Sequence, residues 1–349
     1  MKKYSIFLSS VVALFLFAGV TQAQVFMVVK GDVSTPYTDL EAAVAAAEEG
    51  STVYIPTGEH IILKSQTIAG SVRSTTLLIN KRLSLVGAGS EAGALNATQL
   101  RGDVTLTTEA SGSRFEGLTI TGYFRLDKIS DFLFKRCKAG TIYLSGQGDG
   151  NIFRESMISS INGMTTLYSG AIGHNTTASI FTEILVQNCI ITGNIYYVKK
   201  AILTNNVFTL NGSSIIQQSN QCVITNNIFL YTGAQNIDYG CTWNSYTYNM
   251  TRGTFATPSA SSYNTVGDNI ENAGAANDLF AEQVTYRLKD GAPGKNAGAD
   301  GTDMGIYGGA GAKDKRIPSY PQITEFVVGG TSHADGTLPV SITVEAQEK

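Results

Sequence analysis

The chain contains one short phrase twice, and this repetition restricts the folds that are open to it. Thr-Asn-Asn, a β-branched residue and Phe stand at residues 204–208 and again at residues 225–229. Asparagine tolerates backbone angles that most residues avoid, and it is therefore common at sharp corners. An apolar couple directly after such a corner is typical of a short buried strand. The phrase predicts a corner followed by a strand, repeated along the chain.

The same frame extends over much of the sequence with a period of about 20 residues. In an alignment on the residue before each apolar couple, the corner positions are Gly117, Arg136, Ser156, Asn188, Asn206, Asn227 and Asn249. The step from Ser156 to Asn188 is the longest, which predicts an inserted loop near residues 168–180. Short β-branched runs without helical spacing favour a β-solenoid over a leucine-rich repeat. We predict about eight to ten coils, in which equivalent residues stack.

These repeats resemble those of the pectate-lyase-like superfamily, whose members form a right-handed parallel β-helix with an asparagine ladder at one corner. Residues 37–60, YTDLEAAVAAAEEGSTVYIPTGEH, are similar to the helix and first strand that cap such structures. Thr38 or Asp39 is expected to cap that helix, and one apolar stripe is formed by Leu40, Ala43, Val44 and Ala47. Residues 286–309 resemble the closing coil of bacterial β-helix surface proteins, although Ala292 and Asn296 depart from its usual pattern.

The resemblance implies an all-β chain: a single-stranded right-handed parallel β-helix over residues 24–318 with an N-terminal helical cap. Residues 1–23 have the pattern of a signal peptide, because Lys2 and Lys3 precede an apolar run that is too short to span a bilayer. We therefore expect an exported protein, periplasmic, extracellular or at the cell surface, with no membrane span in the mature chain. Residues 319–349 contain two β-patterned runs, which predict a hairpin-like pair that covers the last coil or leans on its side.

The charge balance bears on partners and cofactors. There are 25 Lys and Arg against 28 Asp and Glu, a formal net charge of −3, without long runs of one sign. This balance argues against nucleic acid or an anionic membrane as a partner, and we expect a monomer. His60 and His333 have no neighbours at metal-ligand spacing. Residues 300–303, Asp-Gly-Thr-Asp, offer too few oxygen ligands for a calcium loop and are better explained as a turn. We expect no metal and no cofactor, and calcium at residues 300–303 is the less favoured alternative.

The four cysteines allow two interpretations. Cys137 and Cys189 each follow a corner residue in the alignment, which predicts buried core positions. Cys222 and Cys241 lie within one period of each other, but their distances from the corner differ. Whether they form a disulfide stays open at this point, because mismatched offsets rarely bring two Cβ atoms into line.

A stripe of tyrosines is the sequence feature that is most informative about function. Alternation along the strands that follow the corners places Phe124, Leu126, Ile142, Leu144 and Leu167 inward. The outward set is Tyr123, Arg125, Asp127, Tyr143, Tyr168, Gln217 and either Tyr196 or Tyr197. In the superfamily this sheet usually lines the substrate groove. Flat rings suit the C–H faces of sugars and polar groups suit their hydroxyls, whereas the alternative is ordinary tyrosine decoration of a solvated sheet.

Two functions follow from this stripe. The first is a noncatalytic protein that binds polysaccharide along the tyrosine-lined sheet. The second is a polysaccharide lyase or glycoside hydrolase, for which the candidate catalytic residues are Asp127, Asp238, Arg125 and Lys199. Enzymes of the superfamily use a calcium-binding acidic cluster with a basic residue, or close aspartates. No Asp-Asp pair occurs in the chain, and His174 has no acids near it in sequence, so binding is favoured while catalysis stays open.

Overall fold

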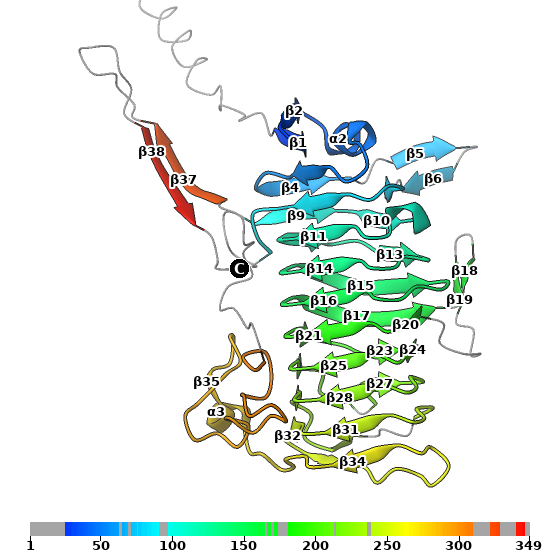
Figure 1. Ribbon diagram of the computed structural model, residues 1–349, viewed down its shortest axis with the longest axis vertical. Helices are drawn as coiled ribbons and strands as arrows, with labels where there is room; N and C mark the ends of the chain where they lie inside the picture. The colour runs from blue at the N-terminus through cyan, green and yellow to red at the C-terminus, as the bar shows by residue number, and fades with distance from the viewer. Residues whose placement is uncertain are drawn as a thin grey trace, which may run out of the picture.

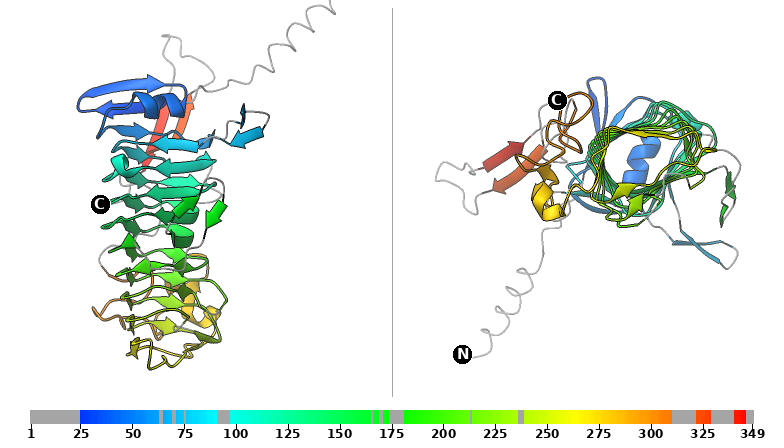
Figure 2. Two further views of the ribbon diagram at one scale, coloured as in Figure 1. Left: turned by 90° about the vertical axis from the view of Figure 1, so that its right-hand side faces the viewer. Right: turned by 90° about the horizontal axis from the view of Figure 1, so that it is seen from below.

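The structure is a computed structural model that describes residues 25–62, 65–68, 71–74, 76–90, 97–164, 166–168, 171–173, 181–212, 214–235, 239–309, 322–328 and 340–345. The expected signal peptide, residues 1–23, lies outside the described residues. Short parallel strands from successive repeats stack into two long sheets, so the chain is all-β and solenoid-like (Figure 1). Seen from below, the coils surround a filled interior (Figure 2).

The first long sheet has 12 strands. It starts with an antiparallel pair, β1 (Phe26–Lys30) and β2 (Val33–Tyr37), and β1 is also antiparallel to β3 (Thr52–Tyr54). All later strands are parallel: β8 (Ser84–Val86), β11 (Arg114–Glu116), β14 (Leu133–Lys135), β16 (Ile152–Arg154), β21 (Leu185–Gln187), β25 (Ile202–Thr204), β28 (Val223–Thr225), β31 (Ser245–Thr247) and β34 (Thr265–Gly267). Their central residues pair in register, as Phe115 does with Phe134, and from β8 to β31 they build the core.

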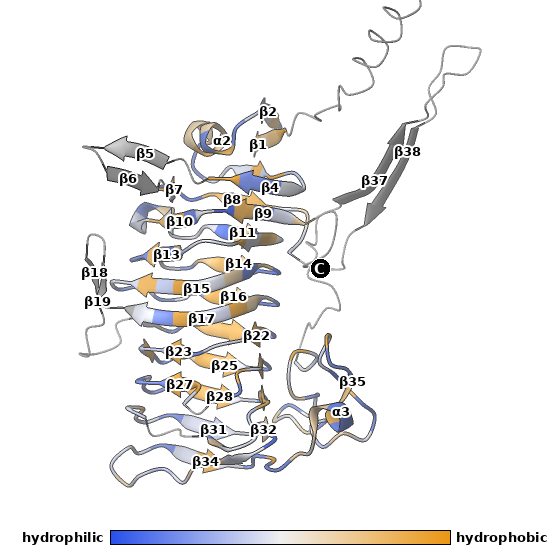
Figure 3. Ribbon diagram, turned by 180° about the vertical axis from the view of Figure 1, so that it is seen from behind, coloured by the Kyte–Doolittle hydropathy of each residue, from blue (hydrophilic) through white to orange (hydrophobic). Residues whose placement is uncertain are grey.

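The second long sheet has 14 strands in two rows. One row directly follows the corner: β4 (Gly58–Ile61), β9 (Thr98–Arg101), β12 (Leu118–Ile120), the first parts of β15 (Lys138–Ser145) and β17 (Met157–Met164), β22 (Ile190–Ile191), β26 (Val207–Phe208), β29 (Ile228–Phe229) and β32 (Met250–Thr251). The other row, which we call the tyrosine face, consists of β7 (Thr76–Ile79), β10 (Asp103–Leu106), β13 (Phe124–Asp127), the later parts of β15 and β17, β23 (Ile195–Tyr196) and β27 (Ile216–Gln217). The hydropathy of these strands, viewed from behind, is shown in Figure 3.

The remaining elements are short. Two antiparallel hairpins leave the stack, β5 (Ser65–Ile68) with β6 (Ser71–Ser74) and β18 (Thr166–Tyr168) with β19 (Ala171–Gly173). Two small parallel pairs are β20 (Phe181–Thr182) with β24 (Val198–Lys199) and β30 (Ala234–Gln235) with β33 (Thr254–Phe255). The predicted insertion near residues 168–180 coincides with the second hairpin. Thr108–Ala110 form a single 3₁₀ turn, η1.

The corner between the two long sheets explains the paired asparagines. The first asparagine of each pair has a positive φ, 55° at Asn205 and 58° at Asn226. The second asparagine, Asn206 or Asn227, has no exposed surface and points into the stack. Asparagine suits both positions, because it accepts left-handed backbone angles and because its amide can satisfy buried backbone groups. The two asparagines of each pair therefore have different structural roles.

The alignment from sequence is wrong at Gly117, Arg136 and Asn188, which occupy the first corner position instead of the second. Gln187 pairs with Thr204, so Asn188 is in register with Asn205, and Cys189 is in register with Asn206. Asn188 also has the positive φ of the first corner position, 52°. An asparagine fits either corner position, and the sequence pattern alone does not distinguish them. Cys189 therefore occupies the buried second position instead of the slot after it.

The N-terminal cap agrees with the prediction. Helix α2 (Leu40–Ala46) starts after Asp39, whose side chain accepts a hydrogen bond from the backbone N–H of Ala42 at 2.9 Å. Its apolar stripe is buried against the first coil: Leu40, Ala43, Val44 and Ala47. Seen along the stack, α2 lies across the opening of the coils (Figure 2). The cap thus covers the apolar interior at the N-terminal end.

Residues 286–309, which were expected to form the closing coil, belong to a segment outside the coils, residues 276–309. This segment contains α3 (Ala276–Leu279) and the antiparallel strands β35 (Phe280–Glu282) and β36 (Arg287–Leu288), and it lies beside the stack (Figure 1). A separate apolar cluster joins this segment to the outer side of three coils; its residues are Val207, Ile228, Met250, Leu279, Phe280, Leu288, Ala292 and Met304. We call residues 276–309 the C-terminal flank. Burial of an apolar row on the outside of the stack accounts for the difference from the expectation.

The C-terminal strands β37 (Gln322–Val328) and β38 (Val340–Glu345) form an antiparallel pair. Figure 1 shows this pair beside the N-terminal half of the stack and far from β34, where a cover for the last coil would lie. Among the described residues, no helix has the length and apolar character needed to cross a membrane.

Candidate functional site

The outward side chains of the tyrosine face form one column in register. Strand pairing places the following residues one above the other: Leu78, Thr105, Arg125, Tyr143, Asn162, Tyr196 and Gln217. The inward residues between them, Phe124, Leu126, Ile142 and Leu144, have no exposed surface, as the alternation predicts. Paired strands lie about 4.8 Å apart, so the column extends over about 30 Å.

Four of the predicted residues, Arg125, Tyr143, Tyr196 and Gln217, belong to this column. The choice between Tyr196 and Tyr197 is resolved by register, because Tyr196 pairs with Asn162 on one side and Gln217 on the other. Tyr197 is the next residue, at a corner with φ 54°, and its ring centroid lies 6.3 Å from that of Tyr196.

Tyr168 does not belong to the column. It lies in β18, which pairs with β19 in a separate two-stranded sheet. The chain continues along β17 as far as Met164 and only then forms this hairpin, so the column position expected for Tyr168 is taken by Asn162. Leu167, expected to point inward, is in the same hairpin.

Asn162 is the residue of this face that sequence reasoning missed. It stands between Tyr143 and Tyr196 in the column and is 7% exposed. Its Oδ1 is buried and has no hydrogen-bond partner within the described part of the chain. A signal was present in the sequence, because Ile161-Asn162 repeats the inward-outward order of Ile142-Tyr143 about one period further along the chain.

The charged groups at the upper end of the face neutralise one another. Nη1 of Arg125 lies 3.3 Å from Oδ2 of Asp103, and its guanidinium carbon is 4.8 Å from the ring centroid of Tyr123. Oδ1 of Asp103 accepts a hydrogen bond from the backbone N–H of Tyr123 at 2.9 Å. The rings of Tyr123 and Tyr143 are 5.7 Å apart at an interplanar angle of 60°. These contacts hold Tyr123, Arg125 and Tyr143 in one aromatic and cationic cluster.

Burial also affects the lower end of the face. The pKa of Tyr196 is raised, first by desolvation and second by the proximity of Tyr197. Tyr196 therefore remains a neutral phenol, able to donate and accept hydrogen bonds, over the physiological range.

The four candidate catalytic residues are not brought together. Arg125 and Asp127 are neighbours on the outer side of β13, where Oδ1 of Asp127 accepts a hydrogen bond from the Ser145 hydroxyl at 3.0 Å. Lys199 lies on β24, beyond the corner at Tyr197 and outside the tyrosine face. Asp238 lies outside the described residues.

The acidic segment of residues 300–303 uses its carboxylates internally. Oδ1 of Asp300 accepts hydrogen bonds from the backbone N–H and the hydroxyl of Thr302, and this side-chain bond is the main cause of its lowered pKa. Asp303 pairs with Lys295 at 2.9 Å and accepts from the backbone N–H of Asn296. Within the described residues, no three His, Cys, Asp or Glu side chains lie close enough together to hold a metal ion.

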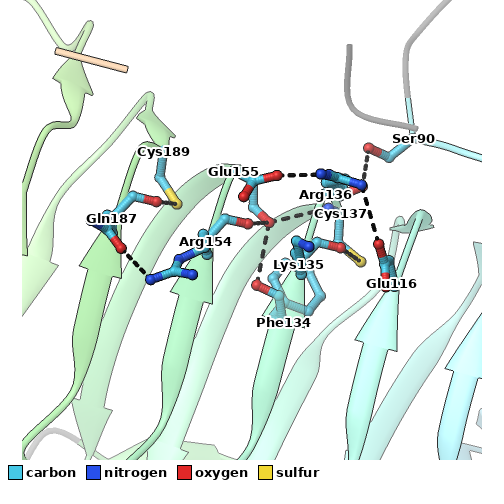
Figure 4. A network of polar contacts seen from close by, with 11 residues as sticks. Ser90, Glu116, Phe134, Lys135, Arg136, Cys137, Arg154, Glu155, Gln187 and Cys189 are labelled. Carbon is cyan, nitrogen blue, oxygen red and sulfur yellow. Dashed lines mark hydrogen bonds and ion pairs between the residues drawn. The ribbon is translucent and has the colours of Figure 1, made fainter. Parts of the chain in front are cut away.

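A second charged cluster surrounds Arg136, which has no exposed surface (Figure 4). Its Nε lies 2.6 Å from Oε2 of Glu155, and its Nη1 lies 3.5 Å from Oε1 of Glu116. Next to it, Nη2 of Arg154 donates to Oε1 of Gln187 at 2.5 Å. The three charged residues Glu116, Arg136 and Glu155 come from successive coils, so this cluster links coils and stabilises the stack.

None of the four cysteines, all of which lie among the described residues, forms a disulfide. Cys137 and Cys189 both occupy the second corner position, where Cys137 receives a hydrogen bond from the backbone N–H of Leu118 and Cys189 donates to the carbonyl of Gln187. Desolvation raises the pKa of Cys189 and of Cys222 to about 12 and that of Cys137 further. Buried protonated thiols of this kind are unreactive. In their coils, Cys137 and Cys189 occupy the buried corner position that asparagine holds at Asn206.

Comparison with known proteins adds no assignment: no protein-family model matches the chain, and no curated protein sequence is significantly similar to it. The geometry of the tyrosine face therefore carries the functional argument.

Proposed function

We propose that this protein binds polysaccharide along the tyrosine face and does not cleave it. The observation that supports this function is the column of outward side chains in register. Tyr143 and Tyr196 supply aromatic rings. Thr105 and Arg125 on one side of them and Gln217 on the other supply hydrogen-bonding groups. Aromatic surface with a few convergent polar groups is the usual composition of a site for a small, hydroxyl-rich ligand.

A linear ligand fits this arrangement better than a compact one. The column follows the long axis of the stack for about 30 Å, so an extended glycan could contact several coils at once. Each contact would contribute modestly, and the affinity would come from their number along one chain. Tyr123 and Tyr197 widen the aromatic surface at two points of the column.

The proposal includes the architecture and the location of the protein. We infer that the stack is a right-handed parallel β-helix of the pectate-lyase-like type, supported by the buried asparagine column and the N-terminal helical cap. In this view, the protein is exported after removal of residues 1–23 and acts in the periplasm, at the cell surface or outside the cell, as a monomer without a cofactor.

The test is a glycan array on the mature chain, followed by chromatography of the bound glycans to detect shortened products. We expect retention of at least one polysaccharide without products. Replacement of Tyr143 and Tyr196 by Ala should abolish retention and leave the melting temperature nearly unchanged, because partly exposed side chains contribute little to stability. Tyr263→Ala removes an exposed tyrosine from a different corner and serves as the control.

Two outcomes would contradict the proposal. If the double variant retained polysaccharide as well as the parent does, the tyrosine face would not be the binding site. Shortened products would show an enzyme, and Asp127→Asn would then test the nearest carboxylate of the face for loss of turnover with retained binding.

A further inference from the structure

We infer that the tyrosine face is specific for an uncharged glycan and rejects polyuronates. This inference rests on the proposed function and concerns the chemical class of the ligand. Three features of the face support it: its charge balance, the existing partner of its cation, and a buried acceptor in the middle of the column.

The charge balance of the face is unfavourable for a polyanion. In the described strands of the tyrosine face, the charged side chains at outward positions are Asp103, Arg125 and Asp127. Two carboxylates and one guanidinium leave a net negative charge. A polyuronate carries a carboxylate on every sugar and would need several uncompensated cations along the column, because like charges at close range repel.

The single cation of the face is already neutralised. Arg125 lies 3.3 Å from Asp103, and both side chains are only 22% exposed. Partial burial strengthens the attraction within this pair relative to a pair in water. A uronate carboxylate would have to displace Asp103, whereas a sugar hydroxyl could accept a hydrogen bond from a remaining guanidinium N–H without breaking the pair.

The middle of the column contains a buried acceptor, which lies just below the surface of the face. Oδ1 of Asn162 is buried without a hydrogen-bond partner in the described part of the chain, and Asn162 lies between Tyr143 and Tyr196, which are about 10 Å apart along the stack. An unsatisfied buried carbonyl oxygen is costly, and a hydroxyl donor relieves that cost. A carboxylate has no proton to donate and would meet another acceptor. A ligand group that reaches Oδ1 of Asn162 is therefore better a sugar hydroxyl than a carboxylate.

Affinity electrophoresis tests this inference with two panels of soluble polysaccharides. The neutral panel contains xylan, galactan, mannan and β-glucan, and the acidic panel contains polygalacturonate and alginate. We expect the parent protein to be retarded by at least one neutral polysaccharide and by neither acidic one. Asn162→Leu should weaken the neutral interaction at least tenfold, and its circular dichroism spectrum and melting temperature report whether the fold is kept.

A charge variant tests whether the selectivity against polyuronates can be removed. Asp103→Asn combined with Asp127→Asn releases Arg125 and changes the net charge of the face from negative to positive. We expect this variant to gain retardation by polygalacturonate that disappears at high salt. The matched control is Glu183→Gln, which removes an exposed carboxylate paired with Lys200 outside the tyrosine face and should change neither panel.

The outcomes separate the two levels of the argument. If the parent binds polyuronate and loses it with Tyr143→Ala, the binding function stands and the inference of a neutral ligand is overturned. If no polysaccharide in either panel is bound, or if binding is indifferent to Tyr143, the proposed function fails and this inference fails with it.

Discussion

Asn206 and Asn227 lie one above the other on adjacent coils, and Oδ1 of Asn227 accepts two hydrogen bonds from Asn206, from its backbone N–H at 2.8 Å and from its Nδ2 at 2.9 Å. The same amide of Asn206 donates to the backbone carbonyl of Val186 at 2.8 Å and accepts from the backbone N–H of Cys189 at 2.9 Å. Asn249 continues the column, accepting from the backbone N–H of Asn227 at 3.0 Å. Each buried amide thus satisfies backbone groups that no strand pairing reaches.

Asn206→Leu should therefore lower the free energy of unfolding by about 1–3 kcal/mol, because the backbone groups of Val186 and Cys189 lose their partner in a buried corner. Urea denaturation measures this change. Gln221→Leu, at an exposed corner, makes a similar change of side chain and should stay within about 0.5 kcal/mol. Equal stability of the Asn206 variant and the parent would show that the column is not needed for folding.

Alkaline pH should destabilise the protein through its buried thiols. The pKa of Cys189 rises from 9.0 to about 12 on folding because of desolvation. The folded state therefore holds its proton more strongly, so the stability is fully present below pH 9 and is lost as the pH rises toward 12. Unfolding free energies measured across this range should fall less steeply for Cys189→Ser, whose hydroxyl does not titrate there. An identical slope for the variant would exclude this thiol as a cause.

Removal of Arg136 should be among the most damaging single changes. Arg136→Met leaves Glu116 and Glu155, whose side chains are 14% and 9% exposed, without their cation, at a cost of about 3–5 kcal/mol. Adding Glu116→Gln and Glu155→Gln to this variant should recover much of the loss, because no uncompensated charge then stays buried. Thermal unfolding of the single and triple variants provides the comparison, and a triple variant as unstable as the single one would contradict the electrostatic explanation.

The C-terminal flank should contribute measurably to stability. Leu279→Ala removes a side chain that is 1% exposed in the cluster joining the flank to the stack, which should cost about 2–4 kcal/mol. Val284, in the same segment, is 88% exposed, and Val284→Ala should change the stability by less than about 0.5 kcal/mol. Two equal melting temperatures would show that the flank is only loosely attached.

The repeat made the general architecture predictable, because a period near 20 residues with short β-branched runs has few other solutions. The side of a strand on which a residue lies was also predictable: alternation places Tyr143 outward between Ile142 and Leu144, and Gln217 outward next to Ile216. The prediction of outward residues failed where the chain departs from the coil repeat. Tyr168 was displaced by a hairpin whose start no residue type marks, and Asn162 holds the column position that Tyr168 was expected to take.

Two other differences have different physical causes. Asn188 was assigned to the buried corner position because asparagine satisfies the demands of both positions, and only strand register separates them. The flank was expected to close the stack, because its residues 286–309 resemble the closing coil of bacterial β-helix surface proteins. Instead, the flank packs against an outward-facing row of apolar side chains, Val207, Ile228 and Met250. Local sequence patterns do not reveal this contact, because the residues that make it are far apart in the sequence.

Fraying from the C-terminal end is restricted by the contacts of the flank. Nδ2 of Asn188 donates to the carbonyl of Gly308 at 2.8 Å, and Oδ1 of Asn226 accepts from the backbone N–H of Ala299 at 2.8 Å, so one segment is bonded to several coils. In an ordinary repeat array each unit contacts only its neighbours, and the terminal unit can open alone. Here the coil that carries Met250 cannot detach without releasing contacts as far back as Asn188. The coils from Asn188 to Met250 should therefore open as a single cooperative unit in hydrogen exchange, with shared protection factors rather than a gradient along the axis.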